Sequence, residues 1–125
     1  MIKNLEDLQV WQKARILSQK IYKITASFPV SEKNILISQL RRASNSVCAN
    51  IAEGFERYHF QESIQFYRTA RGSLSEIKSH LYLALDQGYL SKAELEAIFL
   101  VMDEIGKMLN SLITKTKTYR ANTRL

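Results

Sequence analysis

Two histidines are the residues of this chain best suited to bind a metal or to act as an acid–base catalyst. A di-metal centre built on helices needs four inward-pointing acidic ligands and two Glu-x-x-His pairs. The pairing of Glu76 with His80 has the wrong spacing and no second copy, and His59 lies where the third helix is expected to start. The sequence therefore predicts no metal site and no cofactor.

Nucleophilic catalysis and phosphate-loop chemistry also lack the residues that they need. A serine or cysteine nucleophile requires a base that a third group orients, and neither histidine lies in such an arrangement. Helical ribonucleases pair an arginine with a histidine a few residues later, but Arg57 is too close to His59 and Arg71 is too far from His80. The four glycines stand singly, at positions 54, 72, 88 and 106, so there is no glycine-rich phosphate loop. We expect no catalytic residue and no enzyme activity.

A line of polar residues follows one side of an expected helix, because its members are three or four positions apart. In the next expected helix, Arg68 and Arg71 come shortly before Gly72, and a glycine inside a helix often marks the close approach of another backbone. One interpretation is a structural network or subunit contact, and the other is a basic surface for phosphates. The polar line comprises Gln39, Arg42, Ser46, Asn50, Glu53 and Arg57. The structural candidates are Gln39, Ser46, Asn50, Glu53 and Gly72, and the phosphate-binding candidates are Arg41, Arg42, Arg57, Arg68 and Arg71.

Positive charge is concentrated at the C-terminal end of the chain. The 125 residues carry a net charge of +6. Residues 115–125 hold Lys115, Lys117, Arg120 and Arg124 with no acidic residue, which leaves only +2 for residues 1–114. This segment is either a solvated basic tail without a function or a contact for an anionic partner such as nucleic acid.

Apolar residues recur at helical spacing in four separate segments, and one proline and four glycines suit long helices with short connections. Short connections make neighbouring helices antiparallel. We therefore expect an all-α protein, an antiparallel up-down-up-down four-helix bundle over residues 1–114 with a basic C-terminal tail over residues 115–125. The four apolar stripes are Val10, Ala14, Leu17, Ile21, Ile24 and Phe28; Leu36, Leu40, Ala43, Val47 and Ile51; Phe60, Ile64, Tyr67, Ala70, Leu74, Ile77, Leu81 and Ala84; and Leu95, Ile98, Met102, Ile105, Leu109 and Leu112.

The ends of these helices carry recognisable residues. Ser91 and Glu94 form a capping box at the start of the fourth helix, and Gly88 suits the left-handed residue that ends the third. Further expected end signals are Asn4 and Ser31 as N-caps, Pro29 as the stop after the first helix, and Gly54 as the left-handed end of the second. The third helix should start near Tyr58, and the fourth should fray between residues 114 and 118.

The sequence predicts a cytoplasmic protein that does not enter a membrane. No run approaches the roughly 18 apolar residues of a membrane span. Residues 1–7 turn acidic at once and lack the apolar region of a secretory signal. Cys48 is the single cysteine, which fits a reducing compartment, and we expect it to be a small buried residue.

Many large apolar residues lie beside the stripes and not on them. Scattered apolar side chains on a surface are ordinary, but this number suggests a second buried surface and hence a homo-oligomer. They are Leu8, Trp11, Ile16, Tyr22, Ile35, Ile37, Phe66, Tyr82, Leu83, Phe99, Leu100 and Val101.

Several segments resemble one bacterial protein family. They are DLQVWQKA (residues 7–14), FP (28–29), QLRRA (39–43), SVCANIAEG (46–54), ARGSLSE (70–76) and GYL (88–90). Together they resemble the four-helix-bundle family encoded in intervening sequences of 23S rRNA genes, often labelled a 23S ribosomal RNA-associated protein. The resemblance runs from about residue 5 to residue 115, and the block 39–54 is specific.

That resemblance implies a homopentamer without catalytic residues that associates with 23S rRNA or its fragments. A group with the same fold serves as the accessory subunit of diversity-generating retroelements, where it binds RNA and a reverse transcriptase. We therefore expect a non-enzymatic, oligomeric protein associated with 23S rRNA or another RNA through basic surfaces. The alternative is a protein-binding scaffold, such as a reverse-transcriptase accessory subunit.

Overall fold

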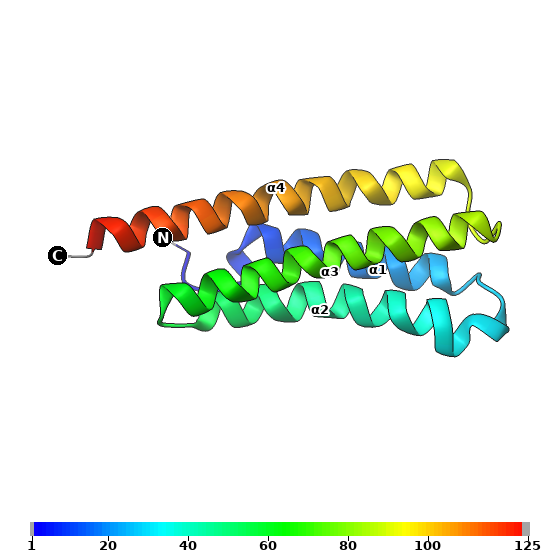
Figure 1. Ribbon diagram of the computed structural model, residues 1–125, viewed down its shortest axis with the longest axis horizontal. Helices are drawn as coiled ribbons and strands as arrows, with labels where there is room; N and C mark the ends of the chain where they lie inside the picture. The colour runs from blue at the N-terminus through cyan, green and yellow to red at the C-terminus, as the bar shows by residue number, and fades with distance from the viewer. Residues whose placement is uncertain (1, 124–125) are drawn as a thin grey trace.

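Four helices account for most of the chain. The computed structural model describes residues 2–123, and only the backbone of residues 120–123. The helices are α1 (Gln9–Thr25), α2 (Ser38–Glu56), α3 (Phe60–Asp86) and α4 (Lys92–Thr123), and the described chain contains no strand. Consecutive helices run in opposite directions along the molecule (Figure 1). The predicted all-α four-helix bundle is confirmed.

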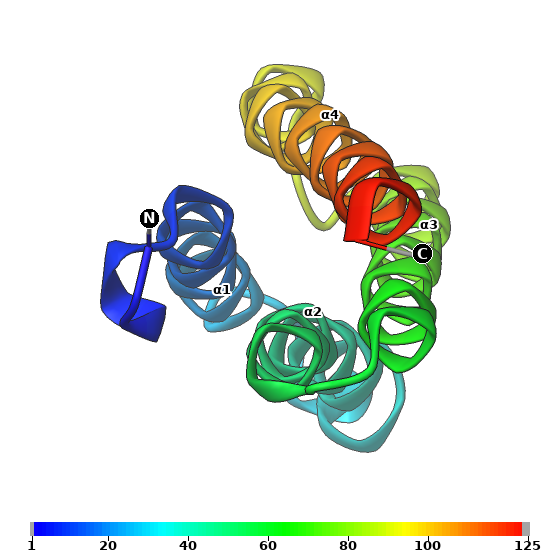
Figure 2. The same ribbon diagram turned by 90° about the vertical axis from the view of Figure 1, so that its left-hand side faces the viewer.

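The apolar stripes meet along the axis of the bundle. Seen from one end, α1, α2, α3 and α4 follow one another around that axis (Figure 2). Every predicted stripe residue is buried except Phe60 and Leu112, which are half-buried at the end of the bundle; Ile113 is buried in place of Leu112. At about 1.5–3 kcal/mol for each fully buried large side chain, this core supplies the main free energy of folding.

Two helix ends form as their residues predict. Gly88 has φ of +77°, and the amides of Gly88 and Tyr89 donate to the carbonyls of Leu85 and Ala84 at 2.9 and 3.0 Å, which closes the last turn of α3. At the start of α4, the Glu94 amide donates to Ser91 Oγ at 3.1 Å, and the Ser91 amide donates to Glu94 Oε1 at 2.9 Å. The capping box is confirmed.

The expected starts of the first three helices differ from the structure. Asn4 and Ser31 make no capping hydrogen bond: Asn4 precedes a short 3-10 helix (Leu5–Asp7), and Ser31 lies inside another (Val30–Glu32). A single π turn (Lys33–Ile37) then leads into α2, so its backbone donors are satisfied without a serine cap. The helix α3 begins at Phe60, two residues later than expected.

The expected ends of α2 and α4 also differ. Gly54 lies inside α2, without the left-handed conformation, and the helix continues to Glu56. The expected fraying of α4 near residues 114–118 is wrong, because α4 continues to Thr123. The hydroxyls of Thr116 and Thr118 donate to the carbonyls of Leu112 and Thr114 at 2.8 and 3.0 Å, which keeps these threonines compatible with the helix. The segment from residue 115 to residue 123 is therefore helical.

Candidate nucleic-acid interface

Histidine and cysteine side chains form no cluster in the structure. No group of three or more His, Cys, Asp and Glu side chains among the described residues is placed to hold a metal ion. His59 is exposed in the connection between α2 and α3, whereas Nδ1 of His80 is buried without a hydrogen-bond partner. Cys48 is half-buried, and that burial raises the pKa of its thiol although the charge of Arg15 acts in the opposite direction. The thiol is therefore not activated as a nucleophile.

The polar line on α2 is in part a hydrogen-bond network to α3. The hydroxyls of Ser46 and Ser73 share a hydrogen bond of 2.9 Å. Asn50 Nδ2 donates to the Ser46 carbonyl at 2.8 Å and to its hydroxyl at 3.0 Å. These half-buried groups satisfy one another and align α2 with α3. Gln39 is half-buried but takes no part in this network.

Gly54, and not Gly72, is the glycine at a close helix contact within the chain. A Cβ added to Gly72 would meet no atom within 4 Å, so the expected close approach at this position does not occur within the chain. A Cβ added to Gly54 would lie 2.5 Å from Cε1 of Tyr67. The apolar pattern fades near Gly54, so the sequence predicted a helix end there and not a close contact with a neighbouring helix.

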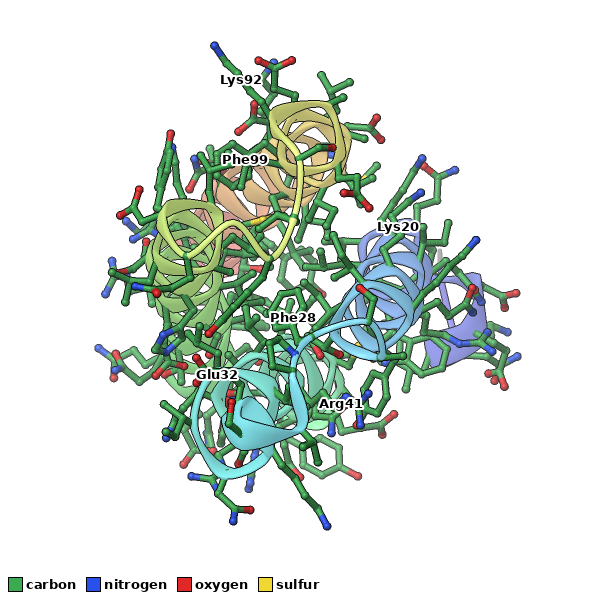
Figure 3. The ribbon with its side chains drawn as sticks, turned by 90° about the vertical axis from the view of Figure 1, so that its right-hand side faces the viewer. Lys20, Phe28, Glu32, Arg41, Lys92 and Phe99 are labelled. Atoms are coloured by element: carbon green, nitrogen blue, oxygen red, sulfur yellow. The ribbon has the colours of Figure 1, made fainter. Side chains whose placement is uncertain are left out.

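Arg41 is committed to a contact between α2 and α1. Its Nε donates to Thr25 Oγ1 at 3.0 Å and its Nη2 to the Tyr22 carbonyl at 3.4 Å, while the guanidinium lies 4.7 Å from the centre of the Tyr22 ring. Figure 3 shows Arg41 on the side of α2 that faces α1. A cation at this position also complements the negative C-terminal end of α1.

The other predicted arginines lie on different faces. Arg42 is exposed on α2, and it has no ion-pair or hydrogen-bond partner among the described residues. Arg71 reaches across from α3 to α4, where its Nη1 donates to Asn110 Oδ1 at 2.7 Å. Arg68 lies on the same side of α3, and with Lys117 of α4 it lines a groove of about 400 Å³. The five arginines therefore do not form one surface.

Four of the predicted cations gather at the end of the bundle where α2 connects to α3. There, Arg57 and Lys115 line a pocket of about 270 Å³, and Arg68 and Lys117 line the neighbouring groove. We call Arg57, Arg68, Lys115 and Lys117 the basic end. The last turns of α4 extend beyond the other helices at this end (Figure 1). The side chain of Arg120 and the whole of Arg124 lie outside the described residues.

The charges of the basic end are mostly uncompensated. Arg57 pairs with Glu53 at 2.8 Å, and its guanidinium lies 4.9 Å from the centre of the Phe66 ring. Arg68, Lys115 and Lys117 have neither an ion pair nor a hydrogen bond with another described residue. Sequence reasoning did not single out Lys78 and Lys107, which line a further groove with Arg71 and the acidic Asp103.

Comparison with known proteins identifies the family. The family model described as "23S rRNA-intervening sequence protein" matches residues 6–111. A solved structure of a protein of unknown function from the S23 ribosomal protein family of Bacteroides thetaiotaomicron has a TM-score of 0.72 and 26% identity, and the match covers 83% of this chain and 97% of that one. No curated protein matches the chain significantly. No described helix has the length and apolar character of a membrane span. The chain belongs to the family of 23S rRNA-intervening sequence proteins.

Proposed function

We propose that this protein is a non-enzymatic, oligomeric RNA-associated protein. Its basic end binds the phosphates of 23S rRNA or of another RNA. The observation that carries the proposal is the clustering of Arg57, Arg68, Lys115 and Lys117 at one end, three of them without an acidic partner in the described chain. The family description, which refers to an intervening sequence of 23S rRNA, points to the same class of partner.

Salt dependence tests this proposal, because phosphate binding releases counterions. Each neutralised phosphate adds about 0.7–0.9 to the slope of log K against log salt. The double variant Arg68→Glu/Lys117→Glu should bind a 23S rRNA fragment more weakly than the unaltered protein and with a smaller slope. Binding that ignores salt, or that this variant leaves unchanged, would contradict the proposal.

A matched control separates position from net charge. Lys20 and Lys92 lie at the opposite end of the bundle, where both side chains point away from it (Figure 3). Lys20→Glu/Lys92→Glu changes the net charge by the same amount as the basic-end variant. If the control weakens RNA binding to the same degree, the attraction is a property of the overall charge, and the basic end is not the interface.

We also propose that the protein is a homo-oligomer, with the pentamer implied by the family resemblance as the expected stoichiometry. Of the apolar residues outside the stripes, Leu8 is buried and others are half-buried against the core, but six remain exposed. These six are Ile16, Tyr22, Ile35, Tyr82, Leu83 and Leu100, and Leu100 exposes 67% of its surface. Such apolar surface is typical of a contact between subunits.

Sedimentation tests the oligomer. We expect a mass several times the 14.4 kDa of one chain, and Ile35→Glu/Leu83→Glu should lower it without unfolding the bundle, because both side chains are exposed. Val30→Glu, in an 84% exposed position of the connection between α1 and α2, is the control. A 14.4 kDa species at micromolar concentration would refute the proposal.

The scaffold alternative uses the same exposed apolar residues to bind a different protein, such as a reverse transcriptase. A protein with this role would show salt-insensitive or no RNA binding, and it would form a complex with that partner which Leu100→Glu weakens. The location of the gene, within a 23S rRNA gene or beside a reverse-transcriptase gene, separates the two functions.

A further inference from the structure

The pocket at the basic end combines three kinds of chemistry in a small volume. It is an open pocket of about 270 Å³ between the end of α2, the start of α3 and the last turns of α4. Arg57 and Lys115 contribute positive charge, Phe60 contributes an aromatic ring, and Ser63 and Tyr67 contribute hydroxyl groups. Neither the apolar stripes nor the charge distribution requires this combination.

The two hydroxyls are the strongest sign of a ligand. Ser63 and Tyr67 expose only 5% and 4% of their surfaces, and neither hydroxyl has a hydrogen-bond partner among the described residues. Among the described residues, Nδ1 of His80 is the one side-chain nitrogen or oxygen that is both fully buried and without a hydrogen-bond partner. The hydroxyl oxygens of Ser63 and Tyr67, which also lack such a partner, are therefore not fully buried and still reach solvent. The pocket that both residues line is where a ligand could satisfy them.

Both hydroxyls can donate at neutral pH. Burial raises the pKa of Tyr67 to about 12, so its phenol keeps its proton. A neutral phenol and a serine hydroxyl each donate one hydrogen bond and accept others. They therefore suit the carbonyl, imine and hydroxyl groups of a nucleobase and ribose, while the two cations suit a phosphate.

We propose that this pocket binds a single nucleotide, with its phosphate between Arg57 and Lys115, its base against the Phe60 ring, and its polar groups on the hydroxyls of Ser63 and Tyr67. The volume of about 270 Å³ lies just below the roughly 300 Å³ at which ordinary small-molecule pockets begin, so it suits one nucleotide better than a longer segment. A free mononucleotide and an unpaired nucleotide of an RNA supply the same chemistry. The assignment to RNA rests on the proposed function, whereas the nucleotide site itself does not.

Nucleoside monophosphates test the site directly. Titration of UMP and AMP, followed by NMR of the backbone amides, should shift the resonances of the residues that line the pocket. Inorganic phosphate and uridine should each bind more weakly than UMP, because each offers only part of the ligand. An absence of shifts at millimolar UMP and AMP would overturn the proposal, and so would equal binding of phosphate alone, which would show an anion site only.

A variant that removes both hydroxyls keeps the charge and both packing volumes nearly unchanged. Ser63→Ala/Tyr67→Phe should weaken UMP binding about tenfold or more, because two hydrogen bonds are lost. Ser27→Ala/Tyr89→Phe removes two hydroxyls at the opposite end and should leave UMP binding unaltered. Unchanged UMP affinity in Ser63→Ala/Tyr67→Phe, with the fold verified by circular dichroism, would overturn the site.

RNA experiments separate failure of the site from failure of the proposed function. An RNA with an unpaired end should bind more tightly than a blunt duplex of equal charge, and Ser63→Ala/Tyr67→Phe should remove that difference. If this variant binds both RNAs as the unaltered protein does while Arg68→Glu/Lys117→Glu binds them weakly, the basic end functions and the nucleotide site is refuted. If UMP binds in the pocket but neither RNA binds, the site stands and the proposed function fails.

Discussion

Gly54 of α2 lies directly against the ring of Tyr67 of α3. A Cβ on Gly54 would be 2.5 Å from Cε1 and 2.8 Å from Cδ1 of that ring, and 3.1 Å from the carbonyl oxygen of Ser63. The absence of a side chain on Gly54 therefore lets α2 and α3 approach closely at the basic end. This close packing also holds in place the ring of Tyr67, which lines the pocket at the basic end.

Gly54→Ala should destabilise the protein by about 1–3 kcal/mol, because the methyl group has no room against a buried ring and a backbone carbonyl. Gly106→Ala is the matched control: its Cβ would meet no atom within 4 Å, and the better helix former should stabilise α4 by up to about 1 kcal/mol. Urea denaturation measures both changes. A Gly54→Ala protein as stable as the unaltered one would show that Tyr67 can move aside.

Gly54 and Gly88 show which role of a glycine the sequence can predict. At Gly88 the chain ends a helix, and the apolar pattern itself stops there, so the left-handed conformation follows from the sequence. At Gly54 the apolar pattern also fades, but the helix continues to Glu56. A glycine is needed there because a Cβ would meet the Tyr67 ring of α3. That need depends on how α2 packs against α3, which local sequence does not contain.

Arg41→Ala should weaken the fold and not the attraction to RNA. The substitution removes the charged hydrogen bond to Thr25 and the contact with the Tyr22 ring, at a cost of about 1.5–3 kcal/mol. Arg42 is exposed and has no partner among the described residues, so Arg42→Ala should change stability by no more than about 0.5 kcal/mol. Thermal unfolding and RNA titration of both variants provide the measurement. A stable Arg41→Ala protein with reduced RNA affinity would reverse this assignment.

The predicted phosphate-binding residues show where sequence reasoning reaches its limit. Arg41 and Arg42 are adjacent in the chain and look equivalent, yet only Arg41 donates a hydrogen bond to Thr25, which lies 16 residues earlier. The grouping of Arg57 and Arg68 with Lys115 and Lys117 likewise depends on the α3–α4 packing. Composition predicts that a basic surface exists, and only the packing decides which cations share it.

Ser91→Ala should destabilise the bundle by about 1 kcal/mol, because the Glu94 amide loses its acceptor at the start of α4. Ser75→Ala, at an exposed position inside α3, removes a hydroxyl without a capping role and should be neutral or slightly stabilising. Chemical denaturation of both proteins compares them. Equal stabilities would mean that water satisfies this helix end as well as Ser91 does.

Stability should fall in strongly alkaline solution because of Tyr67. Its pKa is raised from 10.0 to about 12 by burial, so the folded state retains a proton that the unfolded state has already lost. The unfolded state then binds fewer protons, and the free energy of unfolding decreases as pH rises between about 10 and 12. The slope from this one group is at most about 1.4 kcal/mol per pH unit.

Tyr67→Phe isolates this contribution. Tyr89, whose pKa is raised by its hydrogen bond to Glu32, is present in both proteins, so its effect cancels in the difference. Below pH 9 the difference in unfolding free energy between the two proteins should be constant, and above pH 10 the phenylalanine variant should gain relative stability. Parallel curves up to pH 12 would show that the Tyr67 phenolate is tolerated in the fold, because the pocket would then hydrate it.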